Sequence, residues 1–305
     1  MDLDLSDDQV ALRDGIASLL DGRFGMERVR GGFDRAMFDE LTEAGVFSLR
    51  ADGFSWADCV VVFEQLGRHC VPGPLTACLL SDLRGIVGVV EQPDAMPAWV
   101  EHLDVLDVLL VLDGDRLWHA DPRALDARPS TWPLDPLTPV AAVDSFASCV
   151  RVVADVAEFR RAGAVLTAAL QLGLADRLTE MAVAYAKERV QFDRPIGSFQ
   201  AIKHMLADML TRTEVARAAV YSAGAVLDER PSAAMTHRLA YGAKVVAGDA
   251  AIANGKAATQ VFGGMGFTWE VDVHLYLKRA WVLDSHFGSA DMHADVVARA
   301  LSAAI

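Results

Sequence analysis

Polar and aromatic residues that can bind a ligand gather at a corner between two predicted helices, within the segment Tyr185–Met209. The residues of interest at this corner are Arg189, Gln191, Phe192, Arg194 and Gln200. A guanidinium can hold a phosphate through paired hydrogen bonds, and a phenylalanine ring can cover a flat ring. The corner therefore indicates binding of a phosphorylated ligand, with a solvated turn as the alternative interpretation.

A second candidate segment is Gln260–Gly266, where a predicted helix runs into three glycines. Glycine lets another backbone or a ligand approach closely. As a bare pattern this signal is weak, because the glycines neither follow a strand nor open a phosphate loop. A simple helix stop is the alternative.

A third segment carries His286, Asp291 and His293, which are residue types used in acid–base catalysis and metal binding. Their spacing does not give an HxxxH pair on one helix face, so a turn between helices is the better interpretation. The sequence also lacks GxSxG, P-loop and HExxH motifs. No metal site is predicted.

Composition restricts the class of protein. The 305 residues are 52% hydrophobic and have a formal net charge of -14, which allows a large core and disfavours non-specific nucleic acid binding. Widely spaced cysteines without a CxxC pair predict reduced thiols. The acidic N-terminus and the lack of an apolar run of about 18 residues predict a cytoplasmic protein with no membrane segment.

Helical patterns fill most of the first ninety residues. Ser6–Gln9 has the form of a capping box and predicts a helix over about 6–22. Further helices are predicted over about 34–45 and 55–67, and a fourth from the turn at Pro72–Pro74 to about residue 90. We expect an N-terminal helical domain over residues 1–95.

Strand-like patterns dominate residues 96–155. The apolar run Val105–Leu112 ends in Asp113-Gly114, a hairpin turn dipeptide, and Arg116–His119 is typical of a returning strand. Ala141–Val143 and Ser148–Val153 add strand-like residues. About sixty residues hold only a few strands, so a small middle β-domain is predicted.

Residues 156–305 are predicted to be almost entirely helical. The expected helices cover about 156–190, 198–229, Pro231–Phe262, 270–285 and the residues from about 288. Apolar stripes and short connections predict an antiparallel C-terminal bundle. The fold class is therefore mostly α.

Two of the segments, taken together, resemble the acyl-CoA dehydrogenase family. RVQFDRPIGSFQAIKHMLADM is similar to the family's R-x-x-F-G-x-P-I-x-x-F-Q stretch, with Asp193 standing where glycine is usual. QVFGGMGFTWE, residues 260–270, resembles the family's Q-x-F-G-G-x-G-F-x-x-E segment. The resemblance covers nearly the whole chain and implies a helical N-terminal domain, a middle β-domain and a C-terminal four-helix bundle.

The resemblance also implies an FAD site that lies between subunits. The residues that match the family's cofactor-binding positions are Arg189, Gln191, Phe192, Gln200, Gln260, Val261, Gly263 and Gly264. By resemblance, the first segment meets the pyrophosphate and adenine, and the second meets the adenosine part. In the family's reaction a glutamate removes the α-proton of an acyl-CoA thioester, while the β-hydrogen leaves as hydride to the flavin.

Departures from the family pattern concern the catalytic base and the β-domain. A gap-free count places the usual glutamate at Phe287, and the alternative position on the first bundle helix at Gly163. The nearest acid, Glu158, is more than one helical turn away. The middle domain also lacks the family's Glu-Pro-Gly turn and Trp-Ile-Thr segment, so it is predicted to be truncated. No catalytic residue is assigned to this chain.

These departures predict a non-catalytic subunit of a heteromeric, α2β2 acyl-CoA dehydrogenase. A full-length partner subunit would bind the acyl-CoA, hold most of the FAD and supply the base, with electron-transfer flavoprotein as the acceptor. Such short subunits resemble those of actinobacterial enzymes that degrade steroid side chains, including that of cholesterol, so a steroid acyl-CoA is the substrate hypothesis.

Two alternatives stay open. The first is a self-sufficient homotetramer that uses Glu158, His286 or Asp291 as its base. The second is a non-enzymatic acyl-CoA-binding or scaffold protein that has kept the fold without the flavin.

Overall fold

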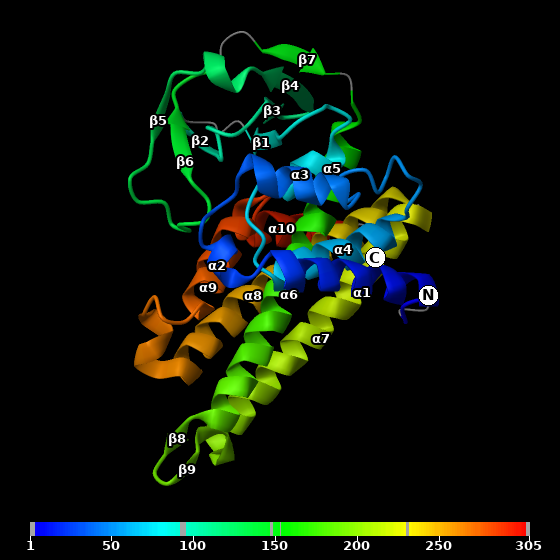
Figure 1. The fold of residues 1–305 in the computed structure, drawn as a ribbon. Coiled ribbons are helices and arrows are strands. Elements are labelled where there is room, and N and C mark those ends of the chain that lie inside the picture. Colours follow the sequence, from blue (N-terminus) through cyan, green and yellow to red (C-terminus); the bar gives the residue numbers. More distant parts are fainter. Residues whose placement is uncertain (1–3, 92–95, 147–148, 153, 230–231, 303–305) are drawn as a thin grey trace. The chain divides into compact units, whose positions relative to one another are not determined.

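Helices make up most of the chain, and the strands form small sheets (Figure 1). This computed structural model describes residues 4–91, 96–146, 149–152, 154–229 and 232–302. Two compact units can be distinguished. The first consists of Met1–Met26, Trp56–Val71 and Ala164–Ile305, and the second of Glu27–Ser55 and Pro72–Gly163.

The first unit is a bundle of helices. Its α-helices are α1 (Asp7–Arg23), α4 (Trp56–Arg68), most of α6 (Val156–Glu188), α7 (Gln200–Glu229), α8 (Ala233–Phe262), α9 (Val273–Ser285) and α10 (Ala290–Ser302). Shorter elements are the strands β8 (Val190–Gln191) and β9 (Arg194–Pro195) and the 3-10 turns η2 (Ile196–Ser198) and η3 (Gly263–Phe267). The β8–β9 hairpin joins α6 to α7 at one end of this pair (Figure 1).

A buried amide connects the three longest helices of this unit. Asn254 on α8 is fully buried, and its Nδ2 lies 3.0 Å from the Met209 carbonyl oxygen and 3.0 Å from the Thr213 hydroxyl on α7. The Thr179 hydroxyl and the Ala175 carbonyl oxygen of α6 lie 3.2 and 3.4 Å from the same nitrogen. Because a buried amide without partners costs about 1–3 kcal/mol, these contacts favour a single register of α6, α7 and α8.

Two glycines allow α4 and α6 to touch through their backbones. A Cβ atom added to Gly67 would overlap the Leu170 carbonyl oxygen, and one added to Gly173 would overlap the Glu64 carbonyl oxygen. Both contacts involve backbone atoms, which cannot move aside as a flexible side chain can. Glycine at these two positions is therefore required by the helix crossing.

The second unit contains both larger sheets. Its helical elements are α2 (Met26–Val29, from Glu27 on), α3 (Arg35–Glu43), α5 (Leu75–Leu80), the 3-10 turn η1 (Pro122–Ala124) and the first turns of α6. Its strands are β1 (Val87–Glu91), β2 (Ala98–Glu101), β3 (Val108–Asp113), β4 (Arg116–Ala120), β5 (Ala127–Pro129), β6 (Val140–Val143) and β7 (Val150–Val152). One sheet has the order β1-β3-β4-β7, and the other has the order β2-β6-β5.

Most predicted elements are confirmed. The capping box at Ser6 and Gln9 starts α1, and the helices expected near 34–45, 55–67, 156–190, 198–229 and 270–285 correspond to α3, α4, α6, α7 and α9. The β3–β4 hairpin is also present, with Asp113 as the last strand residue and Gly114 in the loop at φ +56°. Ser148, Val153 and Pro231, which were included in predicted elements, lie outside the described residues.

The helix predicted from Pro74 to about residue 90 is wrong beyond Leu80. Ser81 is extended, and Val87–Glu91 forms β1, which pairs in parallel with β3. The valines of this stretch are β-branched and favour strands where they can pack on a pleated surface. The pairing that decides their conformation is with residues 108–112, so the local pattern did not reveal it. The division into domains at residues 95 and 155 stays a prediction.

We expect Gly173→Ala to lower the free energy of unfolding by about 1–3 kcal/mol or more, because overpacking forces α4 and α6 apart. The matched control is Gly242→Ala on α8, where an added Cβ meets nothing within 4 Å. That change removes the entropic cost of a helical glycine and should raise stability by about 0.5–1 kcal/mol. Urea denaturation of the two variants measures both effects, and equal stability of the two would contradict the account of the crossing.

Candidate functional site

The candidate site begins with the tight hairpin that follows α6. Val190 pairs with Pro195 and Gln191 with Arg194, so that Phe192 and Asp193 form a two-residue loop. Both loop residues have positive φ, at +52° and +61°, which is the pattern of a type I′ hairpin turn. The Ile196 amide donates to the Arg189 carbonyl oxygen at 2.8 Å and closes the base of the hairpin.

The loop conformation accounts for the family's glycine at the position of Asp193. Glycine adopts φ near +60° without steric cost, and aspartate is among the residues that tolerate this region best. Asp193 is thus compatible with the turn of this chain at a position where the family pattern has glycine. This departure from the family pattern leaves the hairpin geometry intact.

A ring and a cation pack beside the hairpin. The Phe199 ring lies edge to face with Phe192 at 6.1 Å between centroids, and the Arg194 guanidinium carbon lies 4.1 Å from the Phe199 centroid. Such a cation–π contact contributes about 0.5–1 kcal/mol at an exposed site. Phe192 itself is 85% exposed. A large ring is therefore presented to the exterior of this chain by a hairpin of defined geometry.

Stacked aromatic rings join the two sequence segments that were predicted to act together. Tyr185, in the last turns of α6, stacks on Phe262, the last residue of α8, with 4.1 Å between ring centroids and 14° between planes. This contact brings the hairpin region and Gln260–Gly264 to the same end of the first unit. The sequence placed both rings in helices, but it contained no signal that they would meet.

The glycines of the second segment have different environments. Gly263 ends α8 at φ +61° and ψ −137°, a conformation that is nearly restricted to glycine. A Cβ atom on Gly263 or Gly264 would meet nothing within 4 Å, whereas one on Gly266 would come within 2.8 Å of the Thr259 carbonyl oxygen. The first two glycines leave an open backbone surface, and the third packs the turn against the helix.

The polar side chains of the site are available to a ligand. The exposed side chains are those of Arg189, Gln191, Gln200 and Gln260. No other residue that the structure describes makes a side-chain hydrogen bond or ion pair with the Arg189 guanidinium. Val261 is only 4% exposed, so this predicted site residue offers a ligand little surface of its own. A free guanidinium, amides, an exposed ring and an open glycine backbone suit an anionic ligand with a flat ring, and this donor set fits a dinucleotide such as FAD.

Phe287, which occupies the family's position for the base by sequence count, is buried in a tight turn. Its φ is +54°, it is 5% exposed, and its carbonyl oxygen lies 2.8 Å from Nε2 of His293. The His293 ring stacks on Tyr241 at 4.5 Å between centroids. The turn thus packs an apolar ring and an imidazole into the core. Asp291 is exposed in the first turn of α10.

Burial dominates the electrostatics around this turn. Desolvation lowers the pKa of His293 to about 4, with the positive charge of Lys244 adding to the effect. Lys244 is fully buried, and its Nζ donates to the carbonyl oxygens of Leu283 and Asp284 at 3.0 and 3.1 Å. Desolvation lowers the pKa of Lys244 to about 8. The sequence did not predict this buried pair of basic groups, because Lys244 lies in an otherwise ordinary helical pattern.

Metal-binding and membrane-spanning features are not found in the described part of the chain. No group of three or more His, Cys, Asp or Glu side chains there could hold a metal ion. The described helices include none with the length and hydrophobicity needed to cross a bilayer. All four cysteines are free, three of them buried and Cys149 half-buried.

Comparison with known proteins agrees with the two motifs. Residues 156–302 match the family model described as acyl-CoA dehydrogenase, C-terminal domain. The acyl-CoA dehydrogenase IpdE2 of Mycolicibacterium smegmatis is 32% identical over 302 residues, which is 90% of this chain and 93% of that protein. The chain therefore belongs to the acyl-CoA dehydrogenase family.

Solved structures show the same fold. The chain superimposes on one from the ChsE4–ChsE5 complex of Mycobacterium tuberculosis with a TM-score of 0.82, 21% identity and 99% coverage of both chains. It superimposes on a chain of the steroid acyl-CoA dehydrogenase Tcur3481–Tcur3483 with a TM-score of 0.83, 19% identity and 98% coverage of both. The predicted acyl-CoA dehydrogenase fold is confirmed.

The lowered pKa of His293 predicts a pH dependence of stability. The unfolded chain takes up this proton near pH 6.5 and the folded chain only near pH 4, so stability falls as the pH drops through this window. Lys244 titrates outside it. We expect the wild type to lose up to about 2 kcal/mol more than His293→Gln between pH 7 and pH 5. The free energy of unfolding of both proteins is measured by urea denaturation at each pH. An equal change with pH in the two proteins would contradict the assignment of this pH dependence to His293.

Proposed function

We propose that this chain is a non-catalytic subunit of a heteromeric FAD-dependent acyl-CoA dehydrogenase. In this proposal the chain completes an FAD site that is held mainly by a full-length partner subunit, in an α2β2 assembly. The observation that carries the proposal is that the Tyr185–Phe262 stack brings the two segments together. At this place Arg189 is exposed and has no ion-pair partner among the described residues. Such a site suits a ligand supplied from outside this chain.

Each part of the site has a role that follows from its chemistry. Arg189 and Gln191 would pair with the pyrophosphate of FAD, and the exposed Phe192 ring would cover the adenine side. Gln260 and the open backbone at Gly263 and Gly264 would lie along the adenosine. The nearly buried Val261 would support this wall, and Gln200, the first residue of α7, would assist. When bound, FAD supplies the redox chemistry of the dehydrogenation.

The proposal leaves the proton transfer to the partner. Phe287 has no group that can accept a proton, and its turn is closed by the His293 contact to its own carbonyl oxygen. An imidazole with a pKa near 4 that is buried against Tyr241 is a weak base at neutral pH. In the α2β2 assembly the partner subunit would bind the acyl-CoA and supply the glutamate that removes the α-proton.

The similar proteins support the heteromeric form and the substrate class. ChsE4–ChsE5 is a complex of two proteins, and Tcur3481–Tcur3483 is a steroid acyl-CoA dehydrogenase named for a pair of proteins. By analogy with these proteins, we propose that the substrate of the assembly is a steroid side-chain CoA ester, as in cholesterol catabolism. We propose electron-transfer flavoprotein as its electron acceptor. Four free cysteines suit a reducing compartment such as the cytoplasm.

The proposal is tested by removing the Arg189 guanidinium from the assembled enzyme. We expect Arg189→Ala, co-expressed with a full-length acyl-CoA dehydrogenase partner from the same organism, to weaken FAD binding about ten- to hundredfold, because a charge-assisted phosphate contact contributes about 1.5–3 kcal/mol. The FAD dissociation constant of the purified complex is measured by titration of the apoprotein.

Arg299→Ala is the matched control, since Arg299 is an exposed arginine of the same unit whose ion pair is with Asp295 on α10. It should leave FAD affinity unchanged. Equal FAD affinity in the Arg189 variant and the wild type would remove Arg189 from the site. If this chain alone reduced its own FAD with an acyl-CoA, the self-sufficient homotetramer would be correct instead.

A further inference from the structure

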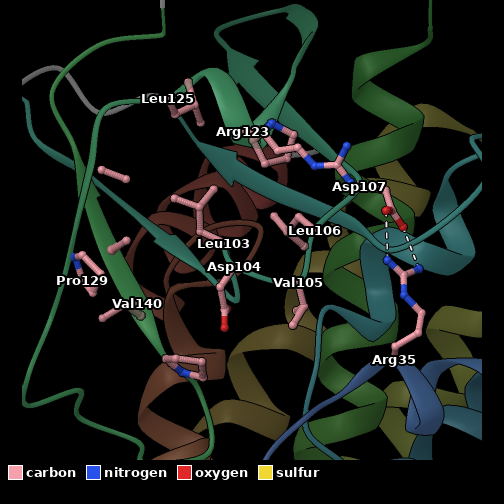
Figure 2. Close-up of a pocket in the computed structure, with 14 residues that line it drawn as sticks. Arg35, Leu103, Asp104, Val105, Leu106, Asp107, Arg123, Leu125, Pro129 and Val140 are labelled. Atoms are coloured by element: carbon pink, nitrogen blue, oxygen red, sulfur yellow. Dashed lines mark hydrogen bonds and ion pairs between the residues drawn. The ribbon is translucent and has the colours of Figure 1, made fainter.

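A groove in the second unit has an apolar wall and one cationic end (Figure 2). Its volume is about 590 Å³, which lies within the usual range of small-molecule sites. The wall is formed mainly by Leu103, Leu106, Leu125 and Val140, which come from the β2–β3 loop, the segment after η1, and β6. None of these residues belongs to the segments proposed to meet FAD.

An acidic residue at the cationic end is held in a fixed position. The Asp107 carboxylate accepts hydrogen bonds from Nη1 and Nη2 of Arg35 at 2.7 and 2.9 Å and from the Ile86 amide at 2.8 Å. A Cβ atom on Gly85, which has φ +97°, would overlap the same carboxylate. The Arg35 guanidinium holds the pKa of Asp107 below its usual range. Asp107 is thus a charged group whose hydrogen-bonding capacity is largely used by Arg35 and the backbone.

Arg123 supplies a second guanidinium at the same end. It lies in η1, where the Asp121 side chain accepts from the Arg123 amide at 3.0 Å and fixes the backbone of the turn. Within the described residues its guanidinium makes no hydrogen bond or ion pair, although its charge lowers the pKa of Asp107. Arg35 is paired with Asp107, so among the described residues that line the groove Arg123 is the cation left to bind an anion. An arginine has five N–H groups to donate.

The other acidic residue of the lining lies away from this end. Asp104 projects from the β2–β3 loop beside Leu103, apart from the Arg123 side of the groove (Figure 2). A ligand with one negative group would therefore be oriented by charge, with that group toward Arg123 and its apolar part along the leucines.

We propose that this groove binds an amphipathic anion, with its carboxylate or phosphate ester group on Arg123 and its hydrocarbon part against Leu103, Leu106, Leu125 and Val140. Guanidinium groups bind both acids through paired hydrogen bonds, and removal of the hydrocarbon part from water supplies the non-directional part of the affinity. The site would give the β-containing unit a ligand of its own. It does not depend on the proposed FAD site.

Binding of decanoate, decyl phosphate and decanol to the full chain, measured by calorimetry at one ionic strength, tests the proposal and distinguishes the two acids. We expect one or both anions to bind about tenfold or more tightly than the uncharged decanol, because only they can pair with Arg123. Arg123→Ala should remove this preference. Arg116→Ala is the matched control, since Arg116 is an exposed arginine of the same unit outside the groove.

A blocking variant separates the groove from adventitious hydrophobic binding. Val140→Trp places a larger side chain in the wall and should abolish binding of all three probes, with the fold checked by circular dichroism and the melting temperature. Equal affinity for decanol and both anions, an Arg123→Ala protein that keeps the preference, or a folded Val140→Trp protein that binds as the wild type does would each overturn the proposal.

Discussion

The buried Asn254 amide is the interaction on which the candidate FAD site depends. It lies where α6, α7 and α8 meet, and its acceptors come from both neighbouring helices. A helix that slipped by one residue would move these acceptors by about 1.5 Å along the axis and through about 100° around it. The amide would then be left without partners in the core. A polar group of this kind favours one arrangement of helices over others of similar hydrophobic burial.

The fixed register of α6, α7 and α8 at the centre of the bundle also determines which side chains lie at the end of these helices. The last turns of α6 carry Tyr185 and the last residue of α8 is Phe262, and their stacking requires both helices to end at the same level. The hairpin then continues from α6 and the glycine turn from α8. Arg189, Phe192 and the open backbone of Gly263 are thereby held near one another before any ligand binds, so little ordering is needed on binding.

The helices and the main hairpin could be predicted from the sequence because their signals are local. The capping box of Ser6 and Gln9 and the Asp113-Gly114 turn act within a few residues. Strand β1 could not be predicted in this way, since its conformation is decided by pairing with residues 108–112. The need for glycine at position 173 comes from the Glu64 carbonyl oxygen, more than a hundred residues away in the chain.

The site shows the same division between local and distant information. Both segments of the candidate site could be found as motifs, and the positive φ of Asp193 agrees with the family's glycine there. The inward direction of the Val261 side chain, the Tyr185–Phe262 contact and the buried Lys244 and His293 depend on which helix faces lie against each other. The groove at Arg123 was not predicted either, because its wall is assembled from loops and strands that are distant in sequence.

We propose that this chain contributes to the site of an FAD that is held mainly by another subunit. The most direct measurement is the native mass of the complex purified after co-expression with the full-length partner, combined with the amount of FAD bound per chain. We expect equal numbers of the two chains in an α2β2 complex, half as many FAD molecules as chains, and no FAD bound to this chain purified alone. One FAD for every chain, or a flavin-loaded homotetramer of this chain by itself, would contradict it.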